Sequence, residues 1–279
     1  MQQKYFLSHH HSGFHRVAYM EWNKNHKDHV VLCVHGLTRN GRDFDALAEA
    51  LQEDFRVICV DLPGRGKSDW LPGPECYGFY SYIDTLTTLI ARLDVESVDW
   101  IGSSMGGGLG IVMASMASSP IQKLILNDCT PIFEPTGNGG VQAFSGKVRT
   151  FENLDTVEAY LRKVYATLAP MTEDQWQHLA RHSVFFSDDG FYRLNYDPTF
   201  FQAPHIPRSD EERLAAWEKI TCPIYLMRGG KSDLVTPRVV EISKKTQPKM
   251  KVVDILEAGH TPSLNDDFQI KTIRKWLME

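Results

Sequence analysis

The pentapeptide Gly102-Ser103-Ser104-Met105-Gly106 constrains this chain more than any other segment. It lies between an apolar strand pattern that ends at Ile101 and an apolar, glycine-rich helix pattern over residues 105–118. Flanking glycines permit a sharp strand-to-helix turn that lifts one serine hydroxyl out of a sheet. Only Ser104 has glycine at both required positions, because Ile101 stands where Ser103 would need one. A phosphate-binding loop is the rival interpretation, but the segment has no P-loop lysine and does not fit the dinucleotide-binding pattern.

A serine hydroxyl becomes a strong nucleophile only when a base removes its proton and a third group orients that base. His260 is the candidate base. It directly follows Gly259, precedes Pro262 by two positions, and comes soon after a strand-like run at residues 251–255. These neighbours predict a loop at the end of a strand rather than a core position.

Other histidines form two groups, namely His9, His10, His11 and His15 near the N-terminus and His178 and His182 on an expected helix. Metal binding is one interpretation of the first group, but we favour solvated strand and turn residues. The second group lacks an E-x-x-H framework and a nearby cysteine pair. We therefore predict no metal site and no cofactor.

The acid that orients the base should follow another strand. We favour Asp233, in the loop after the apolar run at residues 223–228, as this acid. Asp128, at the end of the expected strand 122–127, is the competing candidate, and we interpret it as a partner of neighbouring backbone. The order Ser104, Asp233, His260 is the order expected of an α/β-hydrolase triad.

Two further segments strengthen this resemblance. Val34-His35-Gly36-Leu37-Thr38 follows an apolar strand pattern and is similar to the HG loop of α/β-hydrolases, and residues 61–68 match that family's D-x-x-G-x-G-x-S turn. The chain thus resembles an α/β-hydrolase-fold serine hydrolase with a cap, esterase-like or lactonase-like, over residues 30–128 and 221–279.

The resemblance implies an eight-stranded, mostly parallel sheet flanked by helices, and an oxyanion hole formed by the backbone amides of Leu37 and Met105. His35 would then support the loop and take no part in the reaction. The physical reason for two amides is that acyl transfer places negative charge on a former carbonyl oxygen, and fixed N–H donors stabilise it. Met105 opens a helix, where the helix dipole also favours an anion.

Alternating strand and helix patterns support a parallel sheet with crossover helices. The expected strands span residues 4–8, 14–22, 29–35, 55–60, 96–102, 122–127, 223–228 and 251–255. The expected helices span residues 43–53, 78–93, 105–118, 236–247 and 266–278. We predict a core of residues 1–130 and 220–279, interrupted by a helical cap insertion at 131–219.

The insertion is rich in aromatic residues, and most of them should form its own small core. Some should line an apolar pocket over Ser104. Our candidate substrate-binding residues are Arg39, Phe133, Phe144, Trp176 and Tyr196. Arg39 is the candidate for contacting a carboxylate, since it follows the presumed oxyanion loop, although an exposed arginine with no ligand is the simpler interpretation.

A net charge of −5 over 279 residues argues against nucleic acid or an anionic membrane surface as a partner, and no apolar run approaches membrane-spanning length. Five cysteines without a dense framework indicate reduced thiols and a cytoplasmic setting. The expected partner is a small-molecule substrate.

The sequence therefore predicts a serine hydrolase that cleaves a small ester or lactone through an acyl-enzyme on Ser104. Carbon–carbon bond hydrolysis and acyl transfer by the same fold are alternatives. Leu37-Thr38-Arg39 stands where carbon–carbon hydrolases usually have a glycine-rich run, which makes that alternative weaker. A non-enzymatic ligand-binding sensor is an alternative of another class, and an intact Ser-Asp-His set disfavours it.

Overall fold

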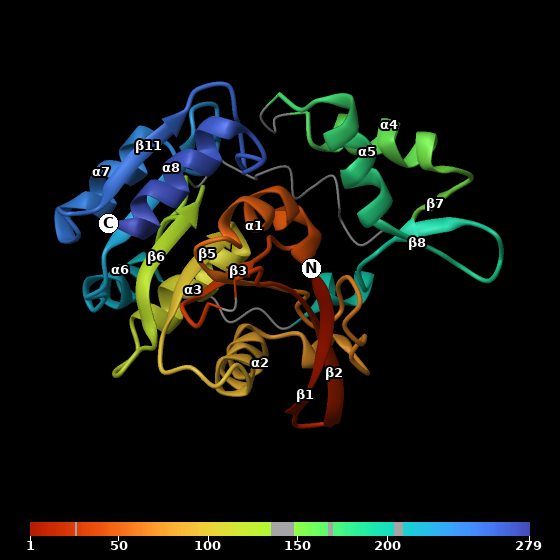
Figure 1. Cartoon of the computed structure of the whole chain (residues 1–279), viewed down its shortest axis with the longest axis horizontal. Helices are drawn as coiled ribbons and strands as arrows, with labels where there is room; N and C mark the ends of the chain where they lie inside the picture. The colour runs from red at the N-terminus through yellow and green to blue at the C-terminus, as the bar shows by residue number, and fades with distance from the viewer. Residues whose placement is uncertain (26, 135–147, 167–169, 204–208) are drawn as a thin grey trace.

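A central sheet of eight strands organises the computed structural model, which describes residues 1–25, 27–134, 148–166, 170–203 and 209–279 (Figure 1). The strand order is β1-β2-β4-β3-β5-β6-β10-β11. The strands are β1 (Gln2–His10), β2 (Gly13–Trp22), β3 (Val30–Val34), β4 (Arg56–Val60), β5 (Val98–Ser103), β6 (Ile121–Asn127), β10 (Ile224–Gly229) and β11 (Lys251–Ile255). Only the pairings β1 with β2 and β2 with β4 are antiparallel, so the expected mostly parallel α/β sheet is confirmed.

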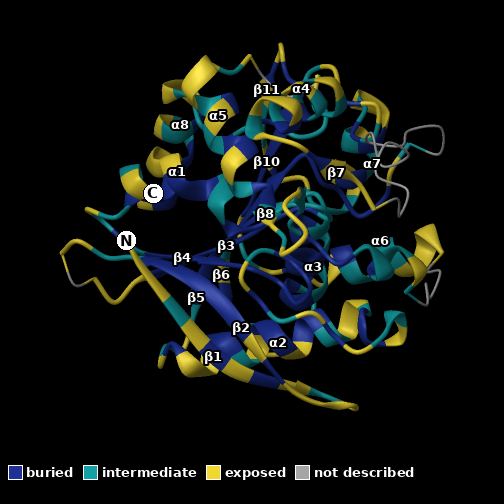
Figure 2. Cartoon of the chain, turned by 90° about the vertical axis from the view of Figure 1, so that its right-hand side faces the viewer, coloured by how far each residue is buried: buried dark blue, intermediate teal, exposed yellow. Residues whose placement is uncertain are grey.

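Two apolar layers form because successive strand residues point to opposite faces of the sheet. In β3, Leu32 packs in the layer that contains α2 and α3, whereas its neighbour Cys33 packs in the layer that contains α1 and α8. Central parallel strands covered on both faces are apolar at nearly every position. Figure 2 shows these strands buried, whereas the hairpin of β1 and β2 carries many exposed residues.

The core helices lie where the periodicity predicted them. They are α1 (Asp45–Leu51), α2 (Phe79–Arg92), α3 (Met105–Ala114), α7 (Pro237–Thr246) and α8 (Asp267–Met278), with short 3-10 turns η1 (Gly41–Phe44) and η2 (Pro74–Cys76). Helix α3 ends at Ala114, four residues before the predicted end. Residues 115–118 form a turn instead of a further helical turn, and Ser118 leaves it at φ +56°.

The segment after β6 is more mixed than the helical insertion that we predicted. It contains β7 (Thr150–Phe151), α4 (Leu154–Val164), α5 (Glu173–His182), β8 (Val184–Phe186), β9 (Tyr192–Leu194) and the 3-10 turn η4 (Pro198–Gln202). The three strands form a separate small sheet in the order β7-β9-β8. Asp189-Gly190 between two aromatic runs is a hairpin signal in the sequence, and Gly190 has the positive φ of +86° that such a turn needs.

Helix α6 (Asp210–Glu218) lies inside the predicted insertion but packs beside α7, away from α4 and α5 (Figure 1). The indole of Trp217 is fully buried, and its N–H donates to the Ser243 carbonyl of α7 at 2.9 Å. Gln247 donates back to the Trp217 carbonyl at 2.9 Å. We therefore propose that the cap is formed by residues 148–203 among those described and that α6 belongs to the core.

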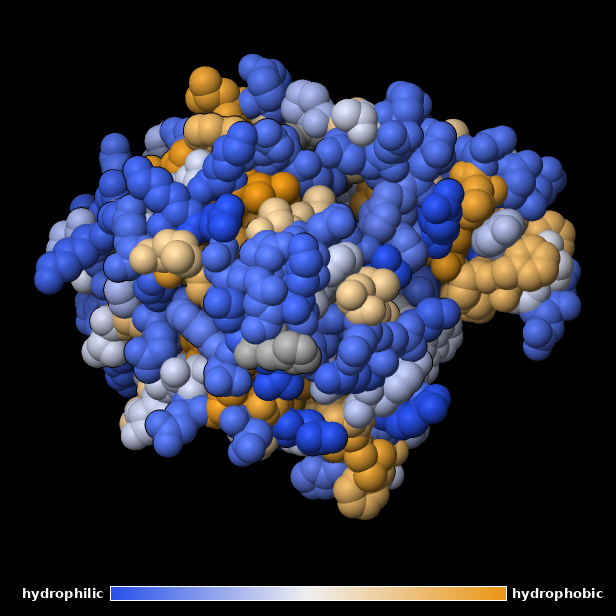
Figure 3. All heavy atoms as spheres, in the orientation of Figure 1, coloured by the Kyte–Doolittle hydropathy of each residue, from blue (hydrophilic) through white to orange (hydrophobic). Residues whose placement is uncertain are grey.

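Polar and charged side chains cover most of the face seen in Figure 3, with apolar side chains in separate patches. Among the helices described, none combines the length and the apolar character that crossing a bilayer requires.

The backbone packs closely at the turn after β5. Alanine substitutions at two glycines of α3 should therefore have opposite effects on the free energy of unfolding. A Cβ on Gly106 would lie 2.0 Å from the Val34 carbonyl oxygen, whereas a Cβ on Gly108 would meet nothing closer than 3.8 Å. Gly106→Ala should lower the free energy of unfolding by more than about 2 kcal/mol through steric strain. Gly108→Ala should raise it by up to about 1 kcal/mol, because alanine is the better helix former. Urea unfolding of both variants tests this, and equal effects would contradict it.

Candidate active site

Ser104 occupies the expected turn between β5 and α3. Its backbone has φ +50° and ψ −113°, outside the regions that L-residues usually adopt. The Ser104 N–H donates to the Asn127 carbonyl at 3.1 Å, and the Ser104 carbonyl accepts from Gly108 at 3.0 Å. These bonds hold the strained residue between β6 and α3, so its side chain stands at the carboxyl edge of the sheet.

A continuous hydrogen-bond chain joins three side chains at this edge. His260 Nε2 lies 2.8 Å from Ser104 Oγ, and His260 Nδ1 lies 2.7 Å from Asp128 Oδ2. Ser104 follows β5, Asp128 follows β6, and His260 lies in the loop after β11. Carboxyl ends of parallel strands meet at one edge of a sheet, which is why residues so far apart in sequence converge here.

The Asp128 carboxylate is fully buried and has several donors. Oδ1 accepts from the Gly229 backbone N–H at 2.8 Å, while Oδ2 accepts from the Ser232 hydroxyl at 2.6 Å in addition to its contact with His260. Buried charges persist when paired and hydrogen-bonded in this way. The residue itself has φ +52°, so Asp128, like Ser104, leaves its strand with a positive φ.

Our choice of Asp233 as the partner of His260 is wrong in the structure. The His260 Nδ1 contact is made by Asp128, whereas Asp233 is exposed in the loop after β10. Ser232, the residue before it, instead turns its hydroxyl toward Asp128. The interpretation of Asp128 as a backbone partner was half correct, because its second oxygen does bind the Gly229 amide.

His35 supports the loop after β3, as the resemblance implied. The side chain is fully buried, with Nδ1 2.7 Å from the Gly36 carbonyl and Nε2 accepting from the Leu62 N–H at 3.0 Å. Burial lowers the pKa of His35 to about 3, so the ring is neutral and donates from Nδ1. A neutral ring with both nitrogens engaged fixes the loop that carries Leu37.

Arg65 is a second support for this loop that the sequence did not single out. Its buried guanidinium donates from Nε to the Leu37 carbonyl at 3.0 Å and from Nη1 to the Pro63 carbonyl at 2.8 Å. The same guanidinium lies 3.8 Å from the centre of the Phe200 ring. The glycine-rich turn at residues 61–68 thus places the Arg65 guanidinium against the Leu37 carbonyl of the loop after β3.

The backbone amides of Leu37 and Met105 belong to the two segments beside Ser104. Within the described ranges, neither amide donates a hydrogen bond to a protein acceptor. Met105 is the first residue of α3, where an unpaired N–H and the helix dipole favour negative charge.

A model of the α/β-hydrolase fold matches residues 29–267, most of the chain. The chain belongs to the α/β-hydrolase family. A 3-hydroxybutyrate-oligomer hydrolase from Cupriavidus necator is 37% identical over 270 residues, covering 93% of this chain and 92% of that protein. Esterase YbfF from Escherichia coli is 26% identical over 259 residues, covering 90% and 94%. The crystal structure of an α/β-hydrolase from Novosphingobium aromaticivorans matches with a TM-score of 0.88 at 28% identity, covering 99% and 98%. These relatives support a hydrolase of this fold.

A cavity of this α/β-hydrolase lies beside Ser104, between the core and the segment after β6. Core residues around it include Leu37, Thr38, Arg39, Phe44, His260 and Leu264. From the other side it is lined by Tyr165, Met171, Gln175, His178 and Leu179. Three of these, at positions 175, 178 and 179, share one face of α5 by helical spacing. Helical spacing in the sequence could therefore have identified these cavity-lining residues of α5, whereas the number of aromatic residues could not.

Most of the predicted pocket aromatics lie elsewhere. Phe133, Trp176 and Tyr196 do not line the cavity as it is formed by the described residues, and Phe144 lies outside those residues. The Trp176 ring packs beneath the Arg162 guanidinium at 5.1 Å, and the buried Tyr196 ring packs against Phe200 at 5.6 Å. These rings pack within the small segment itself, together with its buried aliphatic side chains Val157, Leu161 and Leu194.

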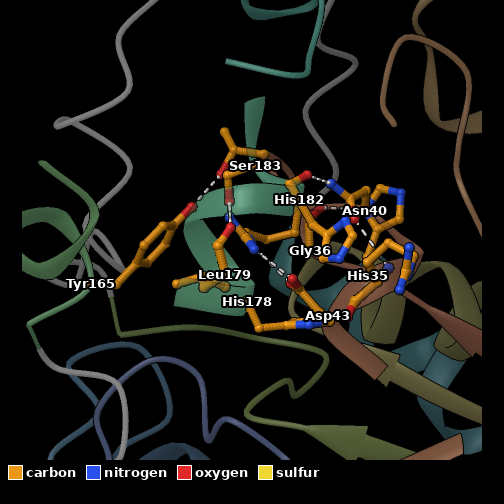
Figure 4. Close-up of polar contacts among 12 residues, drawn as sticks. His35, Gly36, Asn40, Asp43, Tyr165, His178, Leu179, His182 and Ser183 are labelled. Atoms are coloured by element: carbon orange, nitrogen blue, oxygen red, sulfur yellow. Dashed lines mark hydrogen bonds and ion pairs between the residues drawn. The ribbon is translucent and has the colours of Figure 1, made fainter. Parts of the chain in front are cut away.

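Arg39 does line the cavity, but its charge is already paired. Its guanidinium donates from Nε and Nη2 to the two oxygens of Asp43, at 2.8 and 2.5 Å, and from Nη1 to the Ser183 hydroxyl at 2.7 Å (Figure 4). Burial acts to lower the pKa of Arg39, but Asp43 and Tyr165 outweigh it and raise that pKa. The arginine therefore joins core to cap and is not a free carboxylate receptor.

Neighbours of Arg39 make the same connection. The Thr38 hydroxyl lies 3.1 Å from that of Tyr165, and Asn40 donates to the His182 carbonyl at 2.8 Å. His178 Nε2 lies 3.3 Å from an oxygen of Asp45, and this hydrogen bond raises the pKa of His178. Figure 4 shows Tyr165, His178, His182 and Ser183 of the cap facing Asn40 and Asp43 of the core.

Proposed function

We propose that this α/β-hydrolase cleaves carboxyl esters through an acyl-enzyme on Ser104, with His260 as base and Asp128 as the orienting acid. The observation that carries the proposal is the unbroken chain from Ser104 Oγ through His260 to Asp128, beside a cavity. A nucleophile, a base and an orienting group within hydrogen-bond reach are what activation of serine requires.

The reaction follows from this geometry. His260 Nε2 takes the Ser104 proton as Oγ attacks the ester carbonyl, and the Leu37 and Met105 amides bind the resulting oxyanion. The imidazolium, held at Nδ1 by Asp128, gives its proton to the departing alkoxide as the ester C–O bond breaks. Water then attacks the acyl-enzyme, His260 takes its proton, and Ser104 leaves with that proton as the acid product is released.

For the substrate we propose a short linear oligoester of a 3-hydroxy acid. The 37% identical relative from Cupriavidus necator is named for hydrolysis of 3-hydroxybutyrate oligomers, and the similarity covers nearly all of both chains. The cavity suits such a chain because apolar Leu37, Met171 and Leu179 can contact its alkyl branches, while the Thr38 hydroxyl can bond to an ester group. A pure ligand-binding sensor is disfavoured, since binding alone needs no connected triad.

Covalent labelling tests the nucleophile. A fluorophosphonate should label Ser104, and Ser104→Ala should lose both labelling and ester hydrolysis while Ser103→Ala keeps both. Ser103 is the matched control because it adjoins Ser104 but has its hydroxyl 2.9 Å from the Asn127 side chain. Mass spectrometry of the labelled peptide and turnover of a p-nitrophenyl ester provide the measurements. Labelling that persists in Ser104→Ala would defeat the assignment.

Two aspartate variants test the orienting acid. Asp128→Asn should lower kcat by about 10⁴-fold, because an amide beside Nδ1 favours the wrong imidazole tautomer. Asp233→Asn should leave kcat within about tenfold, since no substantial tautomer effect is expected from a loop carboxylate. Circular dichroism verifies that both variants fold. The reverse ranking in two folded proteins would return the acid to the loop after β10.

Substrate comparison tests the oligoester proposal separately from the mechanism. The linear trimer of 3-hydroxybutyrate should have a kcat/KM about tenfold or more above those of β-butyrolactone and of an unbranched ester of equal length, because each added contact favours the bound transition state. Initial rates of acid release measure this. Rapid turnover of all three without preference would contradict the substrate class and leave the ester mechanism standing.

A further inference from the structure

A second cluster of chemically reactive side chains lies at the turn between β1 and β2. One donor atom each from His10, His11 and Cys76 lies within 4.8 Å of the other two. The two histidines come from the hairpin turn, and the cysteine comes from η2, more than sixty positions later. None of the three lines the cavity at Ser104.

His15 is a buried polar side chain next to this cluster. Its side chain is 5% exposed, its ring stacks on that of His10 at 5.3 Å, and neither ring nitrogen has a hydrogen-bond partner among the described residues. Ser8, which pairs with His15 across the hairpin, is also buried, and its hydroxyl is likewise unpartnered there. Buried polar atoms left in this way are commonly satisfied by an ordered water or an ion.

We propose that His10, His11 and Cys76 bind one zinc ion, with water as the fourth ligand. A thiolate and two imidazoles are a donor set that zinc prefers, and three protein ligands leave a position open to water. On binding, the Cys76 thiol loses its proton to solvent and a sulfur–zinc bond forms, with no change of oxidation state.

Present contacts hold the ligands together. The Ser12 hydroxyl lies 2.9 Å from His10 Nδ1 and 3.7 Å from Cys76 Sγ, so it bridges the two side chains that the ion would join. The Ser12 backbone N–H also donates to His10 Nδ1 at 3.0 Å, and zinc bound to this nitrogen would take the place of that bond. Zinc would replace the weak hydroxyl–sulfur contact with direct bonds.

Local charge also suits a cation. A carboxylate oxygen of Glu75 lies 3.7 Å from Cys76 Sγ and adds negative charge beside the thiolate that binding creates.

The ion would tie the hairpin to a segment that contacts the cap. Tyr77, directly after Cys76, donates its hydroxyl to Asp197 at 2.6 Å and accepts from the Leu71 N–H at 2.7 Å. Zinc should therefore stabilise the fold while leaving the chemistry at Ser104 unaltered.

Metal titration of the full chain, without a polyhistidine tag and after chelator treatment, tests the proposal. Cobalt(II) as a probe should give one equivalent of a thiolate-to-metal charge-transfer band, and zinc should displace it and raise the Tm. Cys76→Ser should abolish the band, and His11→Gln should weaken zinc affinity by at least about tenfold. Cys222→Ser and His9→Gln are matched controls, because Cys222 is half-buried and His9 is exposed beside the cluster.

Two results would overturn the zinc site. One is a charge-transfer band that persists in Cys76→Ser, which would assign the thiolate elsewhere. The other is zinc binding that needs His9 as much as His11 and not Cys76, which would show adventitious binding by consecutive histidines. Ester hydrolysis by Cys76→Ser at the wild-type rate verifies that this variant is folded.

Discussion

The Asp128 carboxylate connects the chain segments that meet at the carboxyl edge of the sheet in this hydrolase. It is fully buried, and its two oxygens accept from the Gly229 amide, the Ser232 hydroxyl and His260. Those donors belong to the end of β10, the loop after it and the loop after β11. Burying this charge without partners would destabilise the fold. The Asp128 carboxylate therefore needs the three segments in their folded positions, and it helps to hold them there.

Ser104 and Asp128 also share a positive backbone φ, and the hydrogen bonds around them explain why. Both residues leave a central strand with φ near +50°. This positive φ ends the alternation of the strand, and both side chains contact His260 at the edge of the sheet instead of entering an apolar layer. Strain of this kind persists where the surroundings fix it, and here the amides of Ser104 and Asp128 bond to adjacent strand ends.

Much of the core was predictable because its elements have strong periodic patterns. Short apolar runs bounded by turn residues, as at β3 and β4, indicate buried strands, and the glycines beside Ser104 permit a tight turn. The acid was not predictable in the same way. Asp128 and Asp233 both follow a strand and both satisfy the order serine, acid, histidine, so spacing cannot distinguish them. What decides between them is a three-dimensional fact, namely that Asp128 leaves its strand in a left-handed conformation and meets His260 Nδ1.

The cap resisted sequence reasoning for a different reason. A small segment must bury its large aromatic rings for its own stability, so Trp176 and Tyr196 face inward and the smaller side chains Met171 and Leu179 face the cavity. Composition gives the number of apolar side chains in a segment, but it does not tell which of them pack inside the segment and which face the cavity. The small sheet of β7, β8 and β9 was missed because its strands are only two or three residues long.

Three consecutive residues after Leu37 have a consequence for how such enzymes diversify. Thr38, Arg39 and Asn40 each contact the cap, through Tyr165, Ser183 and His182. The loop that carries the Leu37 amide is therefore also the floor on which the cap rests. A cap exchanged between relatives as an independent module would bring its own partners for these three side chains and shift the loop beneath them. A change of cap that alters the substrate preference therefore needs matching changes at residues 38–40.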